Sequence, residues 1–331
     1  MRRVSSLCVI AVFACGLLVA ACAPAVAPRG SSTTTTTSIP PTTSTTTVPL
    51  PSAVIATIPV GDSPNGLASD GTSVWVANQG PNTVSKISPA TNTVIATVPV
   101  GSDPGCVAWD GASIWVTNYV SGTVTKINPI TNTVTATITV GSYPRGVASD
   151  GTDIWVTNTF SDRVTKINPV TNTVTASINV GSLASDVAWD GTDIWVTSFS
   201  RGSNTVSRIN PITNTVTATI RVGSSPYGLT WDGTSIWVAN SVSNTVSKID
   251  RLTNTVTASI PVGSNPRGVA SDGTSIWVAN RDSNTVSKID PLTNTVTATI
   301  PVGDSPNGLA SDGTSIWVAN RDSNTVSRIR P

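Results

Sequence analysis

A Val-Gly pair recurs along this chain at an almost constant spacing, and this repeat limits the possible fold more than any other feature. The pairs begin at Val60, Val100, Val140, Val180, Val222, Val262 and Val302. The repeat is therefore about 40 residues long, with two extra residues in the fourth unit. A period of this length predicts an array of similar units that bury their apolar faces against their neighbours.

Turn residues divide each unit into four short segments that favour β-structure. In the sixth unit these segments are residues 268–271, 275–279, 285–289 and 295–302. The Asp-Gly pair at 272 favours a tight hairpin, because glycine tolerates positive φ. Charged residues make up only 11% of the chain, and it has one Met, so strong helix formers are scarce. We predict an all-β protein whose seven units are the blades of a β-propeller.

The two ends of the array predict how the ring closes. The last unit stops at Pro331, after its third segment, whereas residues 52–60 (SAVIATIPV) match the fourth segment of the other units (TVTATIPV at 295–302). We expect the N-terminal strand to complete the last blade, because this leaves no strand edge exposed. The propeller is thus predicted to span residues 52–331.

The segment before the repeats has the composition of an export signal and a tether. Residues 1–22 have arginines at positions 2 and 3 and an apolar stretch at 9–21, which is typical of a signal peptide. Residues 19–22 (VAAC) resemble the bacterial lipobox, which implies that Cys22 is lipidated and anchors the protein in a membrane. Cleavage after Ala27, giving a secreted protein, is the alternative. Residues 23–51 are rich in Ser, Thr and Pro and are predicted to be a tether.

The Trp-Val-Ala/Thr-Asn element of each unit, as at 115–118 and 277–280, is followed by Asn-Thr-Val-Ser-Lys-Ile and Thr-Asn-Thr-Val-x-Ala-Thr-Ile-x-Val-Gly. Over residues 52–331 this pattern resembles the YVTN-type β-propeller repeat, with Trp in place of Tyr. The resemblance implies an exported or surface-layer-like propeller. The Asp-Gly-x-x-Ile-Trp-Val pattern is also similar to the streptogramin lyases, whose metal-assisted elimination needs His and Glu. This chain contains neither residue.

Recurring side chains in the units are interpreted as structural. The repeat tryptophans are expected to pack between adjacent sheets: Trp75, Trp115, Trp155, Trp195, Trp237, Trp277 and Trp317. Trp109, Trp189 and Trp231 are also expected to be packing residues. The aspartates before glycine are expected to form hairpin turns on the side opposite the ligand entrance: Asp70, Asp110, Asp150, Asp190, Asp232, Asp272 and Asp312.

The residue types exclude several functions. Without His the chain has no Ser-His-Asp or Cys-His arrangement, so we predict no catalytic residues, no metal site and no cofactor. Cys106, the one cysteine of residues 52–331, has no disulfide partner and no base beside it in the pattern. A net charge of +1 without a basic run argues against nucleic acid as a partner.

The loops in which the units differ point to a binding site. The loops after the fourth and after the second segment of a unit should share one face, and the tyrosines and phenylalanines of the array fall there. With two nearby arginines they form the predicted binding residues: Tyr119, Tyr143, Arg145, Phe160, Phe199, Arg201 and Tyr227. Tyr and Arg are favoured at interfaces. The alternative is that these rings fill the mouth of the central channel.

Together these observations predict a non-enzymatic, extracytoplasmic propeller that binds a protein or glycan of the cell envelope. It would be a cell-surface lipoprotein held through Cys22 or a secreted protein. One alternative is a lyase-like enzyme with a metal ion held by Asp and backbone carbonyls. Another is a structural surface-layer component.

Overall fold

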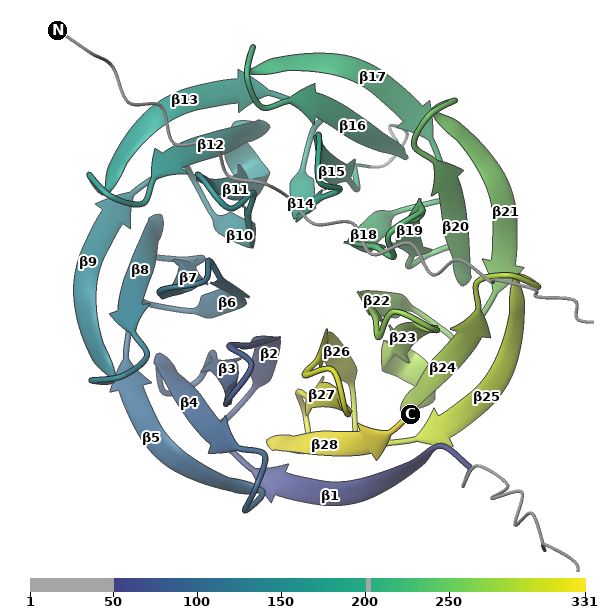
Figure 1. The fold of residues 1–331 in the computed structure, drawn as a ribbon, viewed down its shortest axis with the longest axis horizontal. Helices are drawn as coiled ribbons and strands as arrows, with labels where there is room; N and C mark the ends of the chain where they lie inside the picture. Colours follow the sequence, from purple (N-terminus) through teal and green to yellow (C-terminus); the bar gives the residue numbers. More distant parts are fainter. Residues whose placement is uncertain (1–50, 201–203) are drawn as a thin grey trace, which may run out of the picture. The chain divides into compact units, whose positions relative to one another are not determined.

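The structure, a computed structural model, describes residues 51–200 and 204–331. The signal peptide, Cys22, nearly all of the predicted tether and Arg201 lie outside the described residues. The described chain forms seven four-stranded antiparallel sheets arranged around a central axis (Figure 1). The predicted all-β, seven-bladed propeller is confirmed. No helix within the described residues is long and apolar enough to cross a membrane.

The first four blades are formed by consecutive strands. Blade 1 comprises β2 (Pro64–Ser69), β3 (Val74–Asn78), β4 (Thr83–Ser88) and β5 (Thr93–Pro99). Blade 2 comprises β6 (Pro104–Trp109), β7 (Ile114–Asn118), β8 (Thr123–Asn128) and β9 (Thr133–Thr139). Blade 3 comprises β10 (Pro144–Ser149), β11 (Ile154–Asn158), β12 (Arg163–Asn168) and β13 (Thr173–Asn179), with the 3-10 turn η1 (Thr159–Ser161). Blade 4 comprises β14 (Ala184–Trp189), β15 (Ile194–Ser198), β16 (Thr205–Asn210) and β17 (Thr215–Arg221).

The remaining blades follow the same order until the last. Blade 5 comprises β18 (Pro226–Trp231), β19 (Ser235–Asn240), β20 (Thr245–Asp250) and β21 (Thr255–Pro261). Blade 6 comprises β22 (Pro266–Ser271), β23 (Ile276–Asn280), β24 (Thr285–Asp290) and β25 (Thr295–Pro301), with the 3-10 turn η2 (Arg281–Ser283). Blade 7 comprises β26 (Pro306–Ser311), β27 (Ile316–Asn320), β28 (Thr325–Arg330) and the N-terminal strand β1 (Ala53–Pro59).

Strand β1 pairs antiparallel with β28 and forms the outer edge of blade 7 (Figure 1). Ile58 lies opposite Val326, and its side chain is 2% exposed. Because the first strand of the ring completes its last sheet, the two ends of the repeat array are joined by backbone hydrogen bonds and by apolar contacts.

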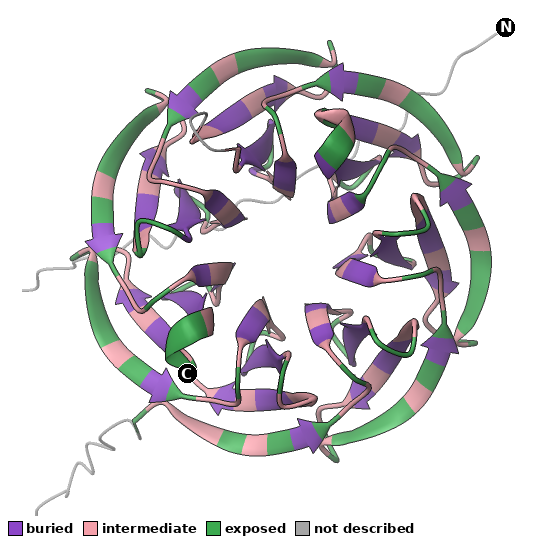
Figure 2. Cartoon of the chain, turned by 180° about the vertical axis from the view of Figure 1, so that it is seen from behind, coloured by how far each residue is buried: buried purple, intermediate pink, exposed green. Residues whose placement is uncertain are grey.

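The core lies between the blades, as the tryptophan pattern predicted. Trp75 of blade 1 is fully buried and packs with Val107 and Ile114 of blade 2. Trp317 of blade 7 packs in the same way with Leu67 of blade 1. Figure 2 shows that the outermost strand of each blade carries most of the exposed residues, whereas the second strand is buried throughout. The stability of the ring thus depends on each blade covering its neighbour.

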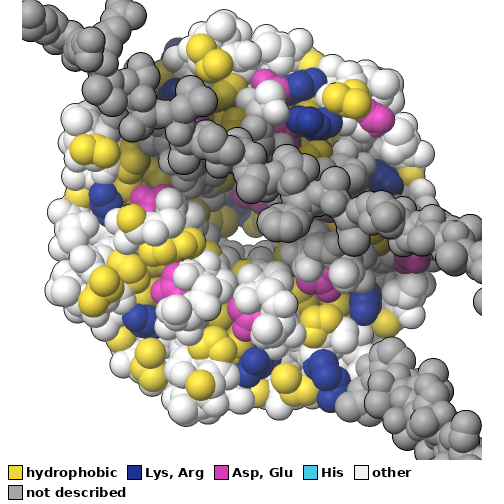
Figure 3. Space-filling model, in the orientation of Figure 1, with side chains coloured by type: hydrophobic (Ala, Val, Ile, Leu, Met, Phe, Trp, Pro, Cys, Tyr) yellow, Lys and Arg dark blue, Asp and Glu magenta, His cyan; other side chains and the backbone are white. Residues whose placement is uncertain are grey.

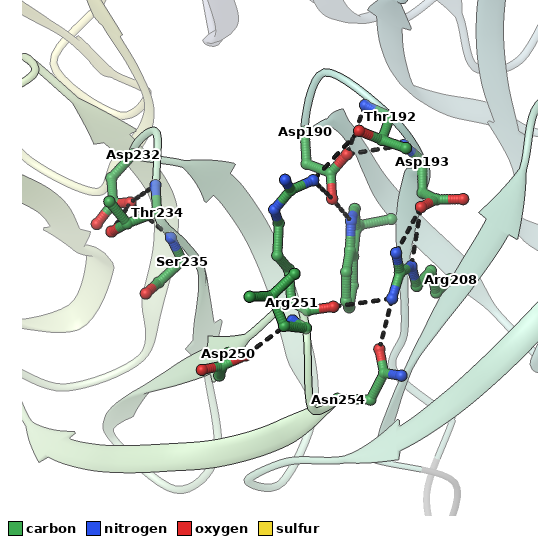
Figure 4. Close-up of polar contacts among 12 residues, drawn as sticks. Asp190, Thr192, Asp193, Arg208, Asp232, Thr234, Ser235, Asp250, Arg251 and Asn254 are labelled. Carbon is green, nitrogen blue, oxygen red and sulfur yellow. Dashed lines mark hydrogen bonds and ion pairs between the residues drawn. The ribbon is translucent and has the colours of Figure 1, made fainter.

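A polar clamp reinforces each contact between blades. Lys86 lies over the Trp75 ring at 4.9 Å and donates a hydrogen bond of 2.7 Å to the carbonyl of Pro129 in the next blade. In blade 4 an arginine has this role: Arg208 donates to the carbonyl of Arg251 at 2.8 Å and pairs with Asp193 at 2.6 Å (Figure 4). The basic residue therefore joins a tryptophan of one blade to a turn of the next.

The loops divide between two faces. The turns η1 and η2 lie on the side that faces the viewer in Figure 2. On this side the loop after the second strand of a blade is hydrogen-bonded to the loop before its first strand, for example Gln79 N–H to the Ser63 carbonyl at 3.1 Å. We call it the variable face. Figure 3 shows the opposite side, where acidic and basic side chains are distributed around the ring.

Candidate functional site

Backbone hydrogen bonds bring the predicted loops together on the variable face. The N–H of Tyr119 donates to the carbonyl of Asp103 at 2.9 Å, and that of Thr159 to the carbonyl of Tyr143 at 3.1 Å. The N–H of Phe199 bonds to the carbonyl of Leu183 at 3.2 Å. The two kinds of variable loop therefore share one face, as the sequence predicted, and their side chains are fixed relative to each other by the blade framework.

Three of the predicted rings form a continuous row. The ring centroid of Tyr143 lies 4.8 Å from that of Tyr119 and 4.8 Å from that of Phe160. The second pair is edge-to-face, with an interplanar angle of 69°. Tyr143 is 41% exposed and Phe160 61% exposed. The row joins blades 2 and 3 and presents ring surface to solvent, which a purely structural cluster would bury.

The other predicted residues gather around Arg145. Its guanidinium carbon lies 4.0 Å from the ring centroid of Tyr227 and 5.6 Å from that of Phe199. The Tyr227 ring also has the guanidinium of Arg267 over it at 4.1 Å. These distances are those of cation–π contacts. The side chain of Arg145 in blade 3 thus contacts aromatic rings of blades 4 and 5 at the mouth of the central channel.

A cavity of about 210 Å³ opens at this mouth. Its lining includes Tyr119, Arg145 and Tyr227 of the predicted set. Tyr143, Phe160 and Phe199 do not line it but contact one another or the lining residues. The structure therefore brings six of the seven predicted residues to one place. Arg201 lies outside the described residues.

The cavity lining also contains residues outside the predicted set. Three further arginines line it, Arg267 and Arg281 from blade 6 and Arg321 from blade 7. Burial lowers the pKa of Arg145 to about 10, and the nearby charge of Arg267 contributes to this shift. Burial and the neighbouring arginines lower the pKa of Arg267 to about 10 as well. Both side chains remain protonated at pH 7. The sequence could have indicated these arginines, because their positions lie in the variable loops.

A second cavity, of about 180 Å³, lies in the central channel and shares Asn65, Arg145, Tyr227 and Asn307 with the first. Asp186 lines it, at the position where five blades have glycine. Burial raises the pKa of this carboxyl to about 6, although the N–H groups of Leu229 and Val187 and the charge of Arg145 oppose the shift. The channel therefore contains an acid with an unusually high pKa, which the repeat pattern did not reveal.

Cys106 lines the same channel cavity, and burial raises the pKa of its thiol to about 12. The thiol is protonated at neutral pH, so it is a poor nucleophile there. Within residues 51–200 and 204–331, no three Asp or Cys side chains lie close enough together to hold a metal ion.

Two residues of the variable face adopt a backbone conformation that disfavours their side chains. Tyr143 has φ 56° and Leu183 φ 57°, in the left-handed region, whereas the equivalent positions of other blades carry Ser, Asp or Asn. This conformation costs roughly 1–2 kcal/mol for an ordinary residue. Strain of this kind is often retained where a side chain has a function.

These features define a seven-bladed propeller with an aromatic and arginine-rich mouth. No protein-family model matches the chain, and no curated protein matches it. Among solved structures, a chain of Kuenenia stuttgartiensis hydrazine synthase superposes with a TM-score of 0.73 at 22% identity, over 81% of this chain and 96% of that chain.

Virginiamycin B lyase from Staphylococcus aureus superposes with a TM-score of 0.72 at 19% identity, over 83% of this chain and 98% of that chain. A catalytically inactive His-to-Ala form of this lyase, solved with quinupristin, gives a TM-score of 0.70 at 19% identity, over 81% and 95% of the two chains. At these identities the likeness shows the fold alone.

Proposed function

We propose that this protein is an exported, non-enzymatic propeller of the YVTN type that binds a protein or glycan of the cell envelope through its variable face. It would be attached to a membrane through lipidated Cys22, on the Ser/Thr/Pro tether of residues 23–51, or be secreted. One observation carries the proposal: Tyr119, Arg145 and Tyr227, from three different blades, line one cavity mouth.

The physical properties of the mouth suit recognition. The rings are large, and their positions are fixed by the blades, so little conformational entropy is lost when a partner covers them. Exposed aromatic surface next to arginines is the composition found at the centres of interfaces. The strained backbone of Tyr143 supports a functional reason for keeping its ring in the row.

The fold likeness to virginiamycin B lyase does not extend to its chemistry. The inactive form of that lyase lacks one histidine. This chain has no histidine at all, and it also has no glutamate. A lyase-like enzyme that holds a metal ion with aspartates and backbone carbonyls is the alternative. It predicts tight binding of a divalent cation, which calorimetric titration with Mg²⁺ measures directly.

The proposal is tested by capture from envelope fractions. The purified protein is immobilised and exposed separately to envelope glycans and envelope proteins from the source organism. A variant with Tyr119→Ser, Phe199→Ser and Tyr227→Ser is compared with a control that loses exposed apolar residues on the opposite face, Ile130→Ser, Val170→Ser and Ile212→Ser. These control residues are 87%, 87% and 88% exposed.

We expect a partner that the wild-type and control proteins capture and the variable-face variant does not, with the unfolding temperature of all three unchanged within a few degrees. Equal capture by all three, or none by any of them, contradicts the proposal. Ordered assemblies of the protein alone would favour the surface-layer alternative.

A further inference from the structure

Within the described residues, the four arginines at the mouth form no ion pair with a carboxylate, although the charges of Asp103, Asp186 and Asp282 act on some of them. Arg145, Arg267, Arg281 and Arg321 all line the same cavity. Among the described residues, the ion pairs involve other basic side chains, and no hydrogen bond is donated by these four guanidinium groups. The Nε atoms of Arg267 and Arg321 are buried without a hydrogen-bond partner. Elsewhere in the propeller, half-buried basic groups such as Arg208 are paired with a carboxylate.

Four guanidinium groups around one cavity raise the free energy of the folded protein unless an anion binds among them. The lining contains one carboxylate, Asp103, against four guanidinium groups. Removing a cation from water costs free energy unless a counter-charge replaces the lost solvation. The like charges also repel one another. Burial and, to a smaller extent, this repulsion lower the pKa values of Arg145 and Arg267. In a protein whose net charge is +1, this concentration of positive charge is local to the mouth.

We propose that the cavity at the mouth binds a single anionic group, a carboxylate, phosphate or sulfate, carried by a sugar of an envelope glycan. The inference rests on the proposed function and names its ligand class. A planar guanidinium donates two parallel hydrogen bonds to such a group. The side chains of Arg267 and Arg321 line the cavity, and their Nε atoms have no hydrogen-bond partner.

The size and surroundings of the cavity favour a sugar. At about 210 Å³ it is smaller than pockets for drug-sized ligands, roughly 300–1,000 Å³, so it admits a small group or the tip of a larger molecule. The row of Tyr119, Tyr143 and Phe160 continues outward from the mouth. Tyrosine offers an apolar face with a hydroxyl at its edge, which matches the mixed polar and apolar faces of a sugar ring.

The test is calorimetric titration of the purified protein with glucuronate, glucose, inorganic phosphate and oligo-aspartate. We expect glucuronate to bind at least tenfold more tightly than each of the other three, and its affinity to fall as NaCl is raised from about 0.05 M to about 0.5 M. Glucose binding equal to glucuronate overturns the anion site. If phosphate or oligo-aspartate binds as tightly as glucuronate, the site does not require that the anionic group be carried by a sugar. If none of the four probes binds, the inference is wrong as a whole.

Two variants separate recognition from folding. Arg281→Gln and Arg321→Gln remove charges that make no ring contact in the structure, and Arg221→Gln, at an exposed position of β17, is the control. Each mouth variant should weaken glucuronate binding about tenfold or more. Each should also raise the unfolding temperature of the free protein by about 2 °C, because an unpaired cation is lost. A structural role for these arginines predicts a lower unfolding temperature instead.

The inference and the proposed function fail in different ways. If the envelope partner is lost with the ring variant but is still captured by Arg281→Gln and Arg321→Gln, the anion site is wrong and the binding face is right. If neither set of variants changes capture, the proposed function itself fails.

Discussion

The indole N–H of Trp277 donates a hydrogen bond of 2.7 Å to the carboxylate Oδ2 of Asp272. The other oxygen of Asp272 accepts from the backbone N–H groups of Thr274 and Ser275 at 2.8 Å and 2.7 Å. The same arrangement is present in every blade. The aspartate of the turn thus also provides the hydrogen-bond acceptor for the indole N–H of the tryptophan that packs against the next blade.

Replacing this aspartate should destabilise the ring markedly. In Asp272→Ala the Trp277 N–H is left buried without an acceptor, so we expect a loss of about 3 kcal/mol in the free energy of unfolding. Urea denaturation measures it. The control Asp282→Ala changes an exposed aspartate of the variable face and should alter stability by less than about 0.5 kcal/mol. Equal effects of the two substitutions would contradict the role given to the Asp–Trp bond.

The strained loop position of blade 4 predicts a stabilising substitution. Leu183 has φ 57°, whereas blade 6 has Asn265 at the equivalent position with φ 53°. Asparagine tolerates this region better than leucine, so Leu183→Asn should stabilise the protein by about 0.5–1 kcal/mol. The reverse change, Asn265→Leu, should destabilise it by a similar amount. Thermal unfolding of the two variants checks the pair, and shifts of the same sign would show that backbone strain is not the cause.

The channel carboxylate predicts a pH dependence. The pKa of Asp186 is raised from 3.8 to about 6, so the folded protein binds this proton more tightly than the unfolded chain. The stability it contributes is fully present below pH 3.8 and is lost as pH rises to about 6, by at most about 3 kcal/mol. Asp186→Asn removes this loss. The stability of the variant relative to wild type should therefore increase between pH 4 and pH 7, and a constant difference would contradict the assignment.

Ring closure predicts the effect of truncation. A protein that begins after Pro59 lacks β1, which exposes the edge of β28 and uncovers Val326, the partner of Ile58. We expect it to aggregate or to unfold at a much lower temperature, because an unpaired strand edge recruits other chains. A protein that begins at Pro51 retains β1 and should behave as the full chain. Size-exclusion chromatography with thermal unfolding distinguishes the two, and similar behaviour would show that β1 is dispensable.

Much of the fold could be predicted because the same pattern of strand and turn residues occurs in seven units. The strands of blade 6 lie within two residues of the predicted segments, and Trp277 packs between blades as expected. That the two kinds of variable loop share one face also followed from their positions in the repeat. These features depend on local turns and on periodicity, which a single sequence displays directly.

The features that could not be predicted depend on contacts between blades, and the period of the repeat does not show which residues make these contacts. Arg267 and Arg321 lie at positions where the units differ, but only the arrangement of the blades shows that they line the same cavity as Arg145. Asp186 replaces the glycine of five other blades, but the sequence does not show that this position lines the central channel. The bond from Lys86 to the Pro129 carbonyl joins residues 43 positions apart. The charge balance of the mouth therefore became visible only in three dimensions.

The most direct test of the account is hydroxyl-radical footprinting of the protein with and without the envelope fraction that it captures. If the variable face binds the partner, five rings become protected from oxidation in the complex: Tyr119, Tyr143, Phe160, Phe199 and Tyr227. The opposite-face residues Ile130, Val170 and Ile212 remain unprotected. Protection confined to the opposite face, or an unchanged pattern at the five rings, would contradict the assignment of the variable face as the binding surface.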